Sequence, residues 1–132
     1  MATEQAASPS KAALWGGRVL SALPVLALLG SGFMKVSHNH DYVETMVGKL
    51  GYPEGPITAI GIAELISVVL YAVPQTAVLG AVLLTGYLGG AVATHVRIGE
   101  GVAVPVIMGM VVWAGLFLRD PRVRALLPLR KV

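Results

Sequence analysis

Five polar side chains of types that can do chemistry lie inside or at the ends of long apolar runs of this sequence. The most unusual is Glu64, the one full carboxylate in the middle of such a run. An ionised group in an apolar environment costs several kcal/mol unless it is paired, so we expect Glu64 to be either paired or protonated. Its candidate partners are Lys35, Tyr87, His95 and Arg97.

The positions of these residues predict that they converge. Glu64 and Tyr87 lie within consecutive apolar runs, at about the same depth. Lys35, His95 and Arg97 close the first and third runs. Helical side chains lean toward the N-terminus of their own helix. Since the second run is antiparallel to the first and third, the basic groups would lean toward the carboxylate, and the carboxylate toward them.

Two interpretations of this polar cluster are open. It is either an ion-pair network that fixes helix packing or a small-molecule site with tuned protonation. In a catalytic site, Glu64 would be the acid or base, and a basic neighbour would stabilise a developing anion. Since the spacing shows no nucleophile with a base and an orienting group, enzymatic activity stays undecided and no catalytic residue is assigned.

Metal and thiol chemistry have little support in the sequence. His38 and His40 alternate with polar residues, and His40 would share a helical face with Glu44. Alternate histidines in a loop, without cysteine or an HExxH pattern, are a weak signal, and we predict no metal site. The chain has no cysteine, so any redox chemistry would need a bound cofactor or a partner.

The composition indicates which elements carry these residues. The chain has 132 residues, of which 55% are apolar and 13% are charged. Globular domains are usually about 45–50% apolar and about 25% charged, and a small soluble fold buries only about two-thirds of its surface. The excess apolar surface must face a bilayer. This excludes cytosolic enzymes and nucleic-acid binders, despite the net charge of +3.

Four apolar runs without two-residue alternation predict an all-α protein, an integral membrane up-and-down four-helix bundle. Each run is 17–22 residues long, which matches a hydrocarbon core of about 30 Å. The predicted spans together form one domain over residues 15–118, and they cover about 15–36, 56–73, 76–96 and 102–118.

The remaining segments are short or polar. Residues 1–14 are predicted to be a disordered cytoplasmic tail, and residues 119–132 a basic cytoplasmic tail on the inner leaflet. The long connection after Ser37 contains a capping pattern from Asp41 to Glu44. It predicts a short amphipathic helix over the mouth of the bundle or on the headgroups.

The distribution of Lys and Arg predicts the orientation. With four spans, seven of these residues lie on the side of the termini and three on the opposite side. Cytoplasmic segments carry the excess of positive charge, so both termini are expected in the cytoplasm. The preferred setting is the cytoplasmic membrane of a bacterium.

Small residues at helical spacing predict where helices approach closely, because they leave room for a neighbouring backbone. They form one stripe on the second run and one on the third: Ala59, Ala63 and Ser67, and Gly86, Gly90 and Ala93.

Three stretches of the chain resemble the DoxX-like family of small four-helix membrane proteins. They are Gly32-Phe33-Met34-Lys35, Gly61-Ile62-Ala63-Glu64 and the stretch from Tyr87 to Gly99. The part that ends in Ala-Thr-His-Val-Arg is the most specific. The resemblance covers about residues 18–118 and implies the bundle and a shared polar cluster of Lys35, Glu64, His95 and Arg97.

Members of this family have been linked to thiosulfate–quinone oxidoreduction, to bacterial membrane oxidoreductase complexes and to receptor assembly in animals. The resemblance therefore implies binding of a quinone-like or lipidic small molecule, in support of a membrane redox partner. Quinone is the cofactor it suggests. The candidate ligand-binding residues are Lys35, Glu64, Tyr87, His95 and Arg97.

Other functions and partners follow from the same residues. A membrane assembly factor or scaffold would use the cluster only as a structural ion-pair network. A self-contained acid/base enzyme would act on a lipophilic substrate. The expected partners are the lipid bilayer, a membrane oxidoreductase and a second copy of the chain, and no nucleic acid.

Overall fold

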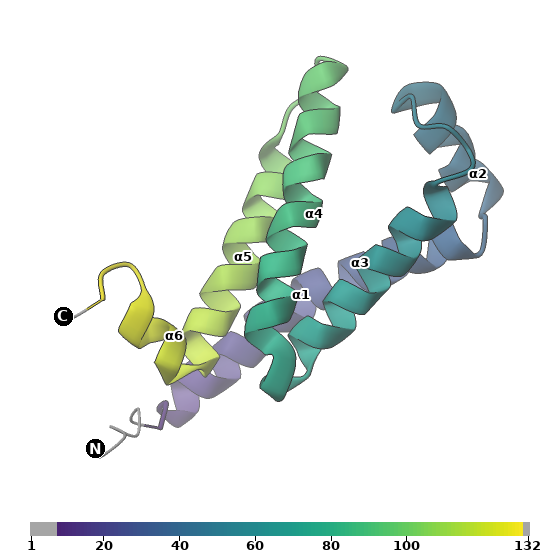
Figure 1. Ribbon diagram of the computed structural model, residues 1–132. Helices are drawn as coiled ribbons and strands as arrows, with labels where there is room; N and C mark the ends of the chain where they lie inside the picture. Colours follow the sequence, from purple (N-terminus) through teal and green to yellow (C-terminus); the bar gives the residue numbers. More distant parts are fainter. Residues whose placement is uncertain (1–7, 131–132) are drawn as a thin grey trace.

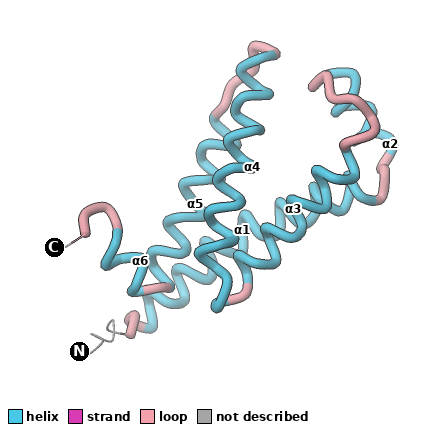
Figure 2. Tube along the Cα trace, in the orientation of Figure 1, coloured by secondary structure: helices cyan, strands magenta, loops and turns pink. Residues whose placement is uncertain are grey.

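The computed structural model describes residues 8–130, and this part of the chain is all-α, without strands. Six α-helices follow one another, joined by short loops (Figures 1 and 2). A π-helical turn, Thr45–Lys49, continues α2, and a 3₁₀ turn, Pro74–Thr76, precedes α4. The helices are α1 (Lys11–Val36), α2 (His40–Glu44), α3 (Ile57–Ala72), α4 (Ala77–Arg97), α5 (Ala103–Arg119) and α6 (Pro121–Leu126).

The four long helices agree with the predicted runs, and two short helices add to them. α1 begins at Lys11, where the Ser10 hydroxyl accepts a hydrogen bond from the backbone N–H of Ala13. Part of the predicted N-terminal tail is therefore helical, and residues 1–7 lie outside the described part. The predicted short amphipathic helix is α2 with its π-helical turn, and its cap is Asn39 rather than Asp41.

The long helices form a ring that is closed at one end and open at the other. α1 contacts α3 and α5, and α4 contacts the same two helices. In Figure 1, α4 and α5 run side by side while α1 and α3 lean away from them. The closed end holds the turn between α3 and α4 and both ends of the described chain, and the open end carries α2. The helices thus form a wedge rather than a uniformly closed bundle.

The buried core lies toward the closed end. At its centre is Tyr71 of α3, whose hydroxyl donates to the Val112 carbonyl of α5 at 2.6 Å and lies 3.0 Å from the Ser21 hydroxyl of α1. The Arg119 guanidinium donates to the Tyr71 carbonyl at 2.8 Å. One phenol therefore ties three helices together, and the apolar residues around it are Leu28, Val68, Ala81, Leu84, Val112 and Leu116.

The close helix contacts are made by other small residues than those predicted. A Cβ added to Gly61 of α3 would lie 2.7 Å from the Lys35 Cβ, and one added to Gly17 of α1 would lie 2.8 Å from the Gly115 carbonyl. By contrast, a Cβ on Gly86 or Gly90 would meet open space. The predicted stripe on α4 is therefore wrong as a contact surface, because the wedge opens along that face of the helix.

The predicted stripe on α3 is also largely wrong. Ala59 and Ala63 are exposed, and only Ser67 is buried, where its hydroxyl donates to the Ala63 carbonyl at 2.7 Å. The reason is that α3 turns the face with Gly61 and Glu64 toward α1.

Large apolar side chains are exposed on all four long helices, for example Phe33 on α1, Ile66 on α3, Val82 on α4 and Ile107 on α5. Two segments are long and apolar enough to cross a membrane by length and composition, Lys11–Val36 and Pro74–Arg97. α3 and α5 are shorter apolar helices.

Candidate functional site

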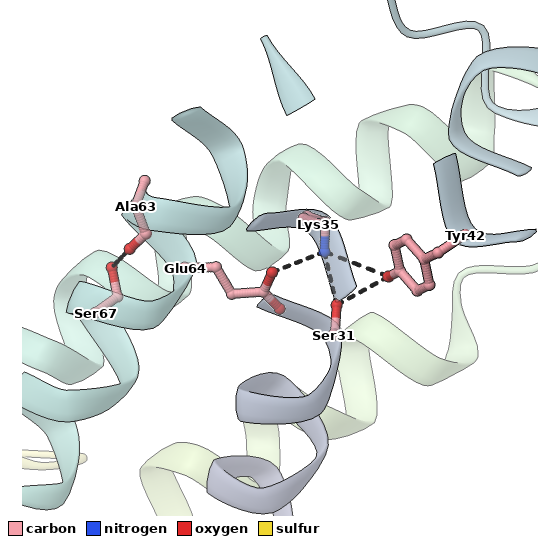
Figure 3. Close-up of polar contacts among 6 residues, drawn as sticks. All are labelled: Ser31, Lys35, Tyr42, Ala63, Glu64 and Ser67. Atoms are coloured by element: carbon pink, nitrogen blue, oxygen red, sulfur yellow. Dashed lines mark hydrogen bonds and ion pairs between the residues drawn. The ribbon is translucent and has the colours of Figure 1, made fainter. Parts of the chain in front are cut away.

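A buried ion pair joins α1 to α3. The Lys35 ammonium lies 2.7 Å from Oε2 of Glu64 (Figure 3). Lys35 is only 3% exposed and Glu64 is 0% exposed. The prediction that Glu64 meets a basic residue is confirmed, and the partner is the lysine in the last turn of α1.

The position of this pair depends on two glycines. Gly61 lies against the Lys35 Cβ and the Gly32 carbonyl, and Gly32 lies against the Leu65 side chain. A larger residue at position 61 would push α1 away from α3, whereas one at position 32 would have to displace the Leu65 side chain. Small residues next to the pair therefore allow a short lysine–carboxylate contact between two helices.

Lys35 is held by two further residues, Ser31 and Tyr42. Its ammonium donates to the Ser31 hydroxyl at 2.6 Å and to the Tyr42 hydroxyl at 3.3 Å, and these hydroxyls are 2.8 Å apart (Figure 3). The ammonium also lies 5.0 Å from the ring centre of Tyr42 and 5.7 Å from that of Tyr87. All three N–H groups of Lys35 are thus used.

Sequence reasoning missed Ser31 and Tyr42. Ser31 precedes Lys35 by one helical turn, and that spacing places two side chains on one helix face. Tyr42 is on the helix predicted to lie over the mouth of the bundle or on the headgroups. Both signals were present, but only the tertiary arrangement shows that α2 turns its tyrosine back toward α1.

One oxygen of the carboxylate has no partner. Oε1 of Glu64 is buried and accepts no hydrogen bond within residues 8–130. A buried polar atom left unsatisfied typically costs about 1–3 kcal/mol, and more when the group is charged. The free acceptor therefore requires an explanation, and a ligand at this position would supply one.

Glu64 lines a cavity of about 430 Å³ in the wedge. α4 contributes Gly86 and Gly90, whose lack of side chains leaves the cavity open. Residues 40–52, here called the α2 strap, contribute one wall, and the apolar lining includes Leu28, Met46, Ile60, Leu88, Val104 and Met108. Mostly apolar walls with a few convergent polar groups are typical of small-molecule sites.

The other predicted site residues divide into two groups. Tyr87 and His95 line the cavity, and the His95 Nδ1–H donates to the Ala91 carbonyl at 2.7 Å. Arg97 does not join the cluster: it is exposed and donates to the Leu50 carbonyl in the strap. The predicted convergence of all three basic residues on Glu64 is therefore wrong for Arg97, because the helices diverge at its end of α4.

Contacts with the end of α4 hold the α2 strap over the cavity. Besides the bond from Arg97, the Tyr52 and Thr94 hydroxyls are 2.6 Å apart, and the Lys49 ammonium lies 2.8 Å from the Glu100 carboxylate. This hydrogen bond from Lys49 holds the pKa of the Glu100 carboxyl below its usual range. The strap thus connects the two sides of the wedge.

The ligand atoms of His40, Asp41 and Glu44 lie within 4.8 Å of one another. All three residues are exposed, and Nε2 of His40 lies 3.7 Å from Oε2 of Glu44. This arrangement is common on solvated surfaces and assigns no metal site.

The comparisons with known proteins give one match. The model of the DoxX-like family matches residues 19–115, which include Lys35, Glu64, Tyr87, His95 and Arg97. No curated protein and no solved structure matches the chain. Since the matched region spans well over half of the 132 residues, the chain belongs to the DoxX-like family.

Proposed function

We propose that this protein is a small integral membrane protein whose cavity binds a lipophilic small molecule, with the polar end of that molecule at the Lys35–Glu64 pair. The observation that carries the proposal is the free Oε1 of Glu64 in a residue that is 0% exposed and lines a cavity of about 430 Å³. A purely structural ion pair would leave this oxygen unsatisfied at a cost.

Membrane insertion of all four long helices is supported by their apolar outer faces. α3 has 16 residues and α5 has 17, so each is about 24–26 Å long at ~1.5 Å per residue. Local thinning of the bilayer or snorkelling of flanking residues accommodates helices a few ångströms shorter than the hydrocarbon core. In this arrangement the Lys35–Glu64 pair lies below the surface of the open half of the wedge.

A quinone-like or other lipidic molecule is suited to the apolar lining. The chain has no cysteine, so a redox role would pass through the bound molecule to a membrane partner. Both termini are proposed to lie in the cytoplasm, which would place the α2 strap and the cavity mouth on the opposite face of the membrane.

A second candidate function is that of a membrane scaffold. It is favoured by the full use of the Lys35 ammonium, which ties α1, α3 and α2 together without any ligand. In that case the pair serves helix packing alone, and filling the cavity would have no functional consequence.

Filling the cavity separates these functions. In Gly90→Leu the new side chain enters the cavity, whereas in Gly89→Leu it faces away from it, and neither glycine has a neighbour within 4 Å of an added Cβ. Native mass spectrometry of the protein released from membranes should show a lipophile that is lost in Gly90→Leu and kept in Gly89→Leu. The same bound species in both variants would favour the scaffold.

A further inference from the structure

We infer that the ligand is a neutral lipophile that carries a hydroxyl group, an alcohol or a phenol, whose O–H donates to Oε1 of Glu64. The inference rests on the proposed function and narrows its ligand class. It excludes molecules that can only accept hydrogen bonds, such as oxidised quinones and ethers, as preferred ligands.

The donors of Lys35 are already used within the protein. Its three N–H groups reach Glu64, Ser31 and Tyr42 at 2.7, 2.6 and 3.3 Å. An ammonium has three donors and no acceptor, so an additional acceptor on a ligand would have to displace one of these oxygens. Lys35 therefore positions Glu64 rather than binding the ligand directly.

On the α4 side of the cavity, Thr94 and His95 also use their donors within the described part of the protein, whereas Tyr87 does not. The Thr94 hydroxyl donates to the Gly90 carbonyl at 2.9 Å, so the Tyr52 hydroxyl must donate to Thr94. The His95 Nδ1–H donates to the Ala91 carbonyl. When the ring is neutral, its Nε2 is then an acceptor.

Among the described residues that line the cavity, the one fully buried polar side-chain atom without a partner is an acceptor. This atom is Oε1 of Glu64, which has no donor within hydrogen-bond distance among the described residues. The remaining donors are two hydroxyl hydrogens, that of Tyr87 and one of the Ser31–Tyr42 pair. A ligand hydroxyl can donate to Oε1 and accept from one of these hydroxyls, whereas an ether or carbonyl oxygen leaves Oε1 unsatisfied.

Charge balance indicates that the ligand is neutral. The lysine and the carboxylate compensate each other in a site where both are almost completely buried. An ammonium or carboxylate on the ligand would add a third, uncompensated charge to that site, and burying such a charge is costly. A hydroxyl satisfies Oε1 without this cost, and the apolar lining accommodates the rest of the molecule.

Two probes that differ only in the donor test the inference. 4-Hexylphenol has an O–H, and 4-hexylanisole has a methyl ether at the same position. For the protein in nanodiscs, we expect the phenol to bind about 10- to 100-fold more tightly, the range for one hydrogen bond to a charged acceptor. Equal or tighter binding of the anisole would overturn the inference, while binding of either probe in the cavity would leave the proposed function standing.

Glu64→Gln tests the acceptor itself. The amide oxygen would stay toward Lys35, so the NH₂ group would take the place of Oε1 and turn an acceptor into a donor. The preference for the phenol over the anisole should fall to within about threefold. An unchanged preference would overturn the assignment to Oε1. Because the readout is a ratio of two affinities measured on the same sample, it does not depend on how much of the variant is folded.

Two further variants distinguish the role of Oε1 from that of Tyr87 and from that of the cavity itself. Tyr87→Phe removes a neighbouring hydroxyl but keeps Oε1, so the preference for the phenol should persist; its loss would assign the donor recognition to Tyr87 and contradict the inference. Gly90→Leu should abolish binding of both probes. If both probes bind Gly90→Leu as they bind the original protein, the cavity is not the site and the proposed function itself fails.

Discussion

At the residue scale, the stability of the protein depends on Lys35 and Glu64 being present together. Each partner is almost fully buried, so removing one leaves a charge without compensation. Such single removals typically cost ~3–5 kcal/mol, far more than the net value of the pair. Both residues are therefore needed for α1 and α3 to pack against each other. The pair as a whole nevertheless adds little net stability.

We expect Lys35→Met to lower the free energy of unfolding by ~3–5 kcal/mol, because Glu64 loses its counter-ion. Lys49→Ala removes a lysine that is exposed and pairs with Glu100 at the surface, so it should change stability by less than about 1 kcal/mol. Denaturant unfolding in detergent micelles measures both. Equal effects of the two variants would contradict the burial argument.

The double variant Lys35→Met with Glu64→Leu removes both charges, so the stability should recover. If binding of the phenol probe remains lost in this stable protein, the charges serve ligand recognition. If function also recovers, they serve packing alone.

At the element scale, glycines at the crossing of α1 and α3 allow the ion pair to form. Gly61→Ala would place a methyl group 2.7 Å from the Lys35 Cβ and 3.1 Å from the Gly32 carbonyl. Overpacking of this kind typically costs about 1–3 kcal/mol. We expect a loss of stability in that range, measured by unfolding, together with weaker binding because α1 is displaced from α3.

Gly89→Ala is the matched control on α4. Nothing lies within 4 Å of its added Cβ, and alanine favours helix more than glycine does. Its stability should be unchanged or slightly higher. If Gly89→Ala lost as much stability as Gly61→Ala, the effect of Gly61→Ala could not be assigned to the contact between α1 and α3.

The α2 strap should respond to acid at its Lys49–Glu100 contact. Lys49 and, more weakly, His95 hold the pKa of Glu100 below its unfolded value. The contact therefore stabilises the strap above the unfolded pKa, and this stabilisation is lost as the pH falls through the lower, folded pKa. The strap should loosen slightly as the pH falls below the ordinary glutamate pKa of about 4.3, because an exposed ion pair contributes little net stability.

Spin labels on Val47→Cys and Val96→Cys can measure this opening, since the chain has no cysteine of its own and both positions are exposed. The distance distribution should broaden below about pH 4 in the original background. In Glu100→Gln, which lacks the titrating carboxylate, the distance distribution should already be broader at neutral pH. It should then no longer respond to protonation at position 100. A distribution that is narrow and independent of pH in both proteins would show that Tyr52 and Arg97 hold the strap without Glu100.

At the scale of the whole molecule, the wedge places both ends of the described chain at its closed end (Figure 1). If both termini lie in the cytoplasm, as proposed, a cysteine at Asn39 should react with an impermeant thiol reagent in intact cells, and one at Ser8 should not. The positive-inside bias is the physical reason. The reverse labelling pattern would contradict the orientation and place the cavity mouth on the cytoplasmic side.

Local properties of the chain were predictable from the sequence. The long apolar runs specify helices because every backbone group must be satisfied within its own segment in an apolar medium, and the joints at Pro74 and Gly99 end them. Glu64 was expected to find a basic partner for the same energetic reason, and Lys35 is that partner. These conclusions needed only hydropathy, helical rise and the cost of a buried charge.

Only the tertiary structure shows which surfaces face one another. Small residues look alike in sequence, yet Gly61 lies in a helix crossing while Gly86 and Gly90 line the cavity, because the helices converge at one end and diverge at the other. The same divergence leaves Arg97 with the Leu50 carbonyl rather than with Glu64. Sequence alone also does not show that Oε1 of Glu64 lacks a hydrogen-bond partner. That depends on where side chains of α1, α2 and α4 lie relative to the carboxylate.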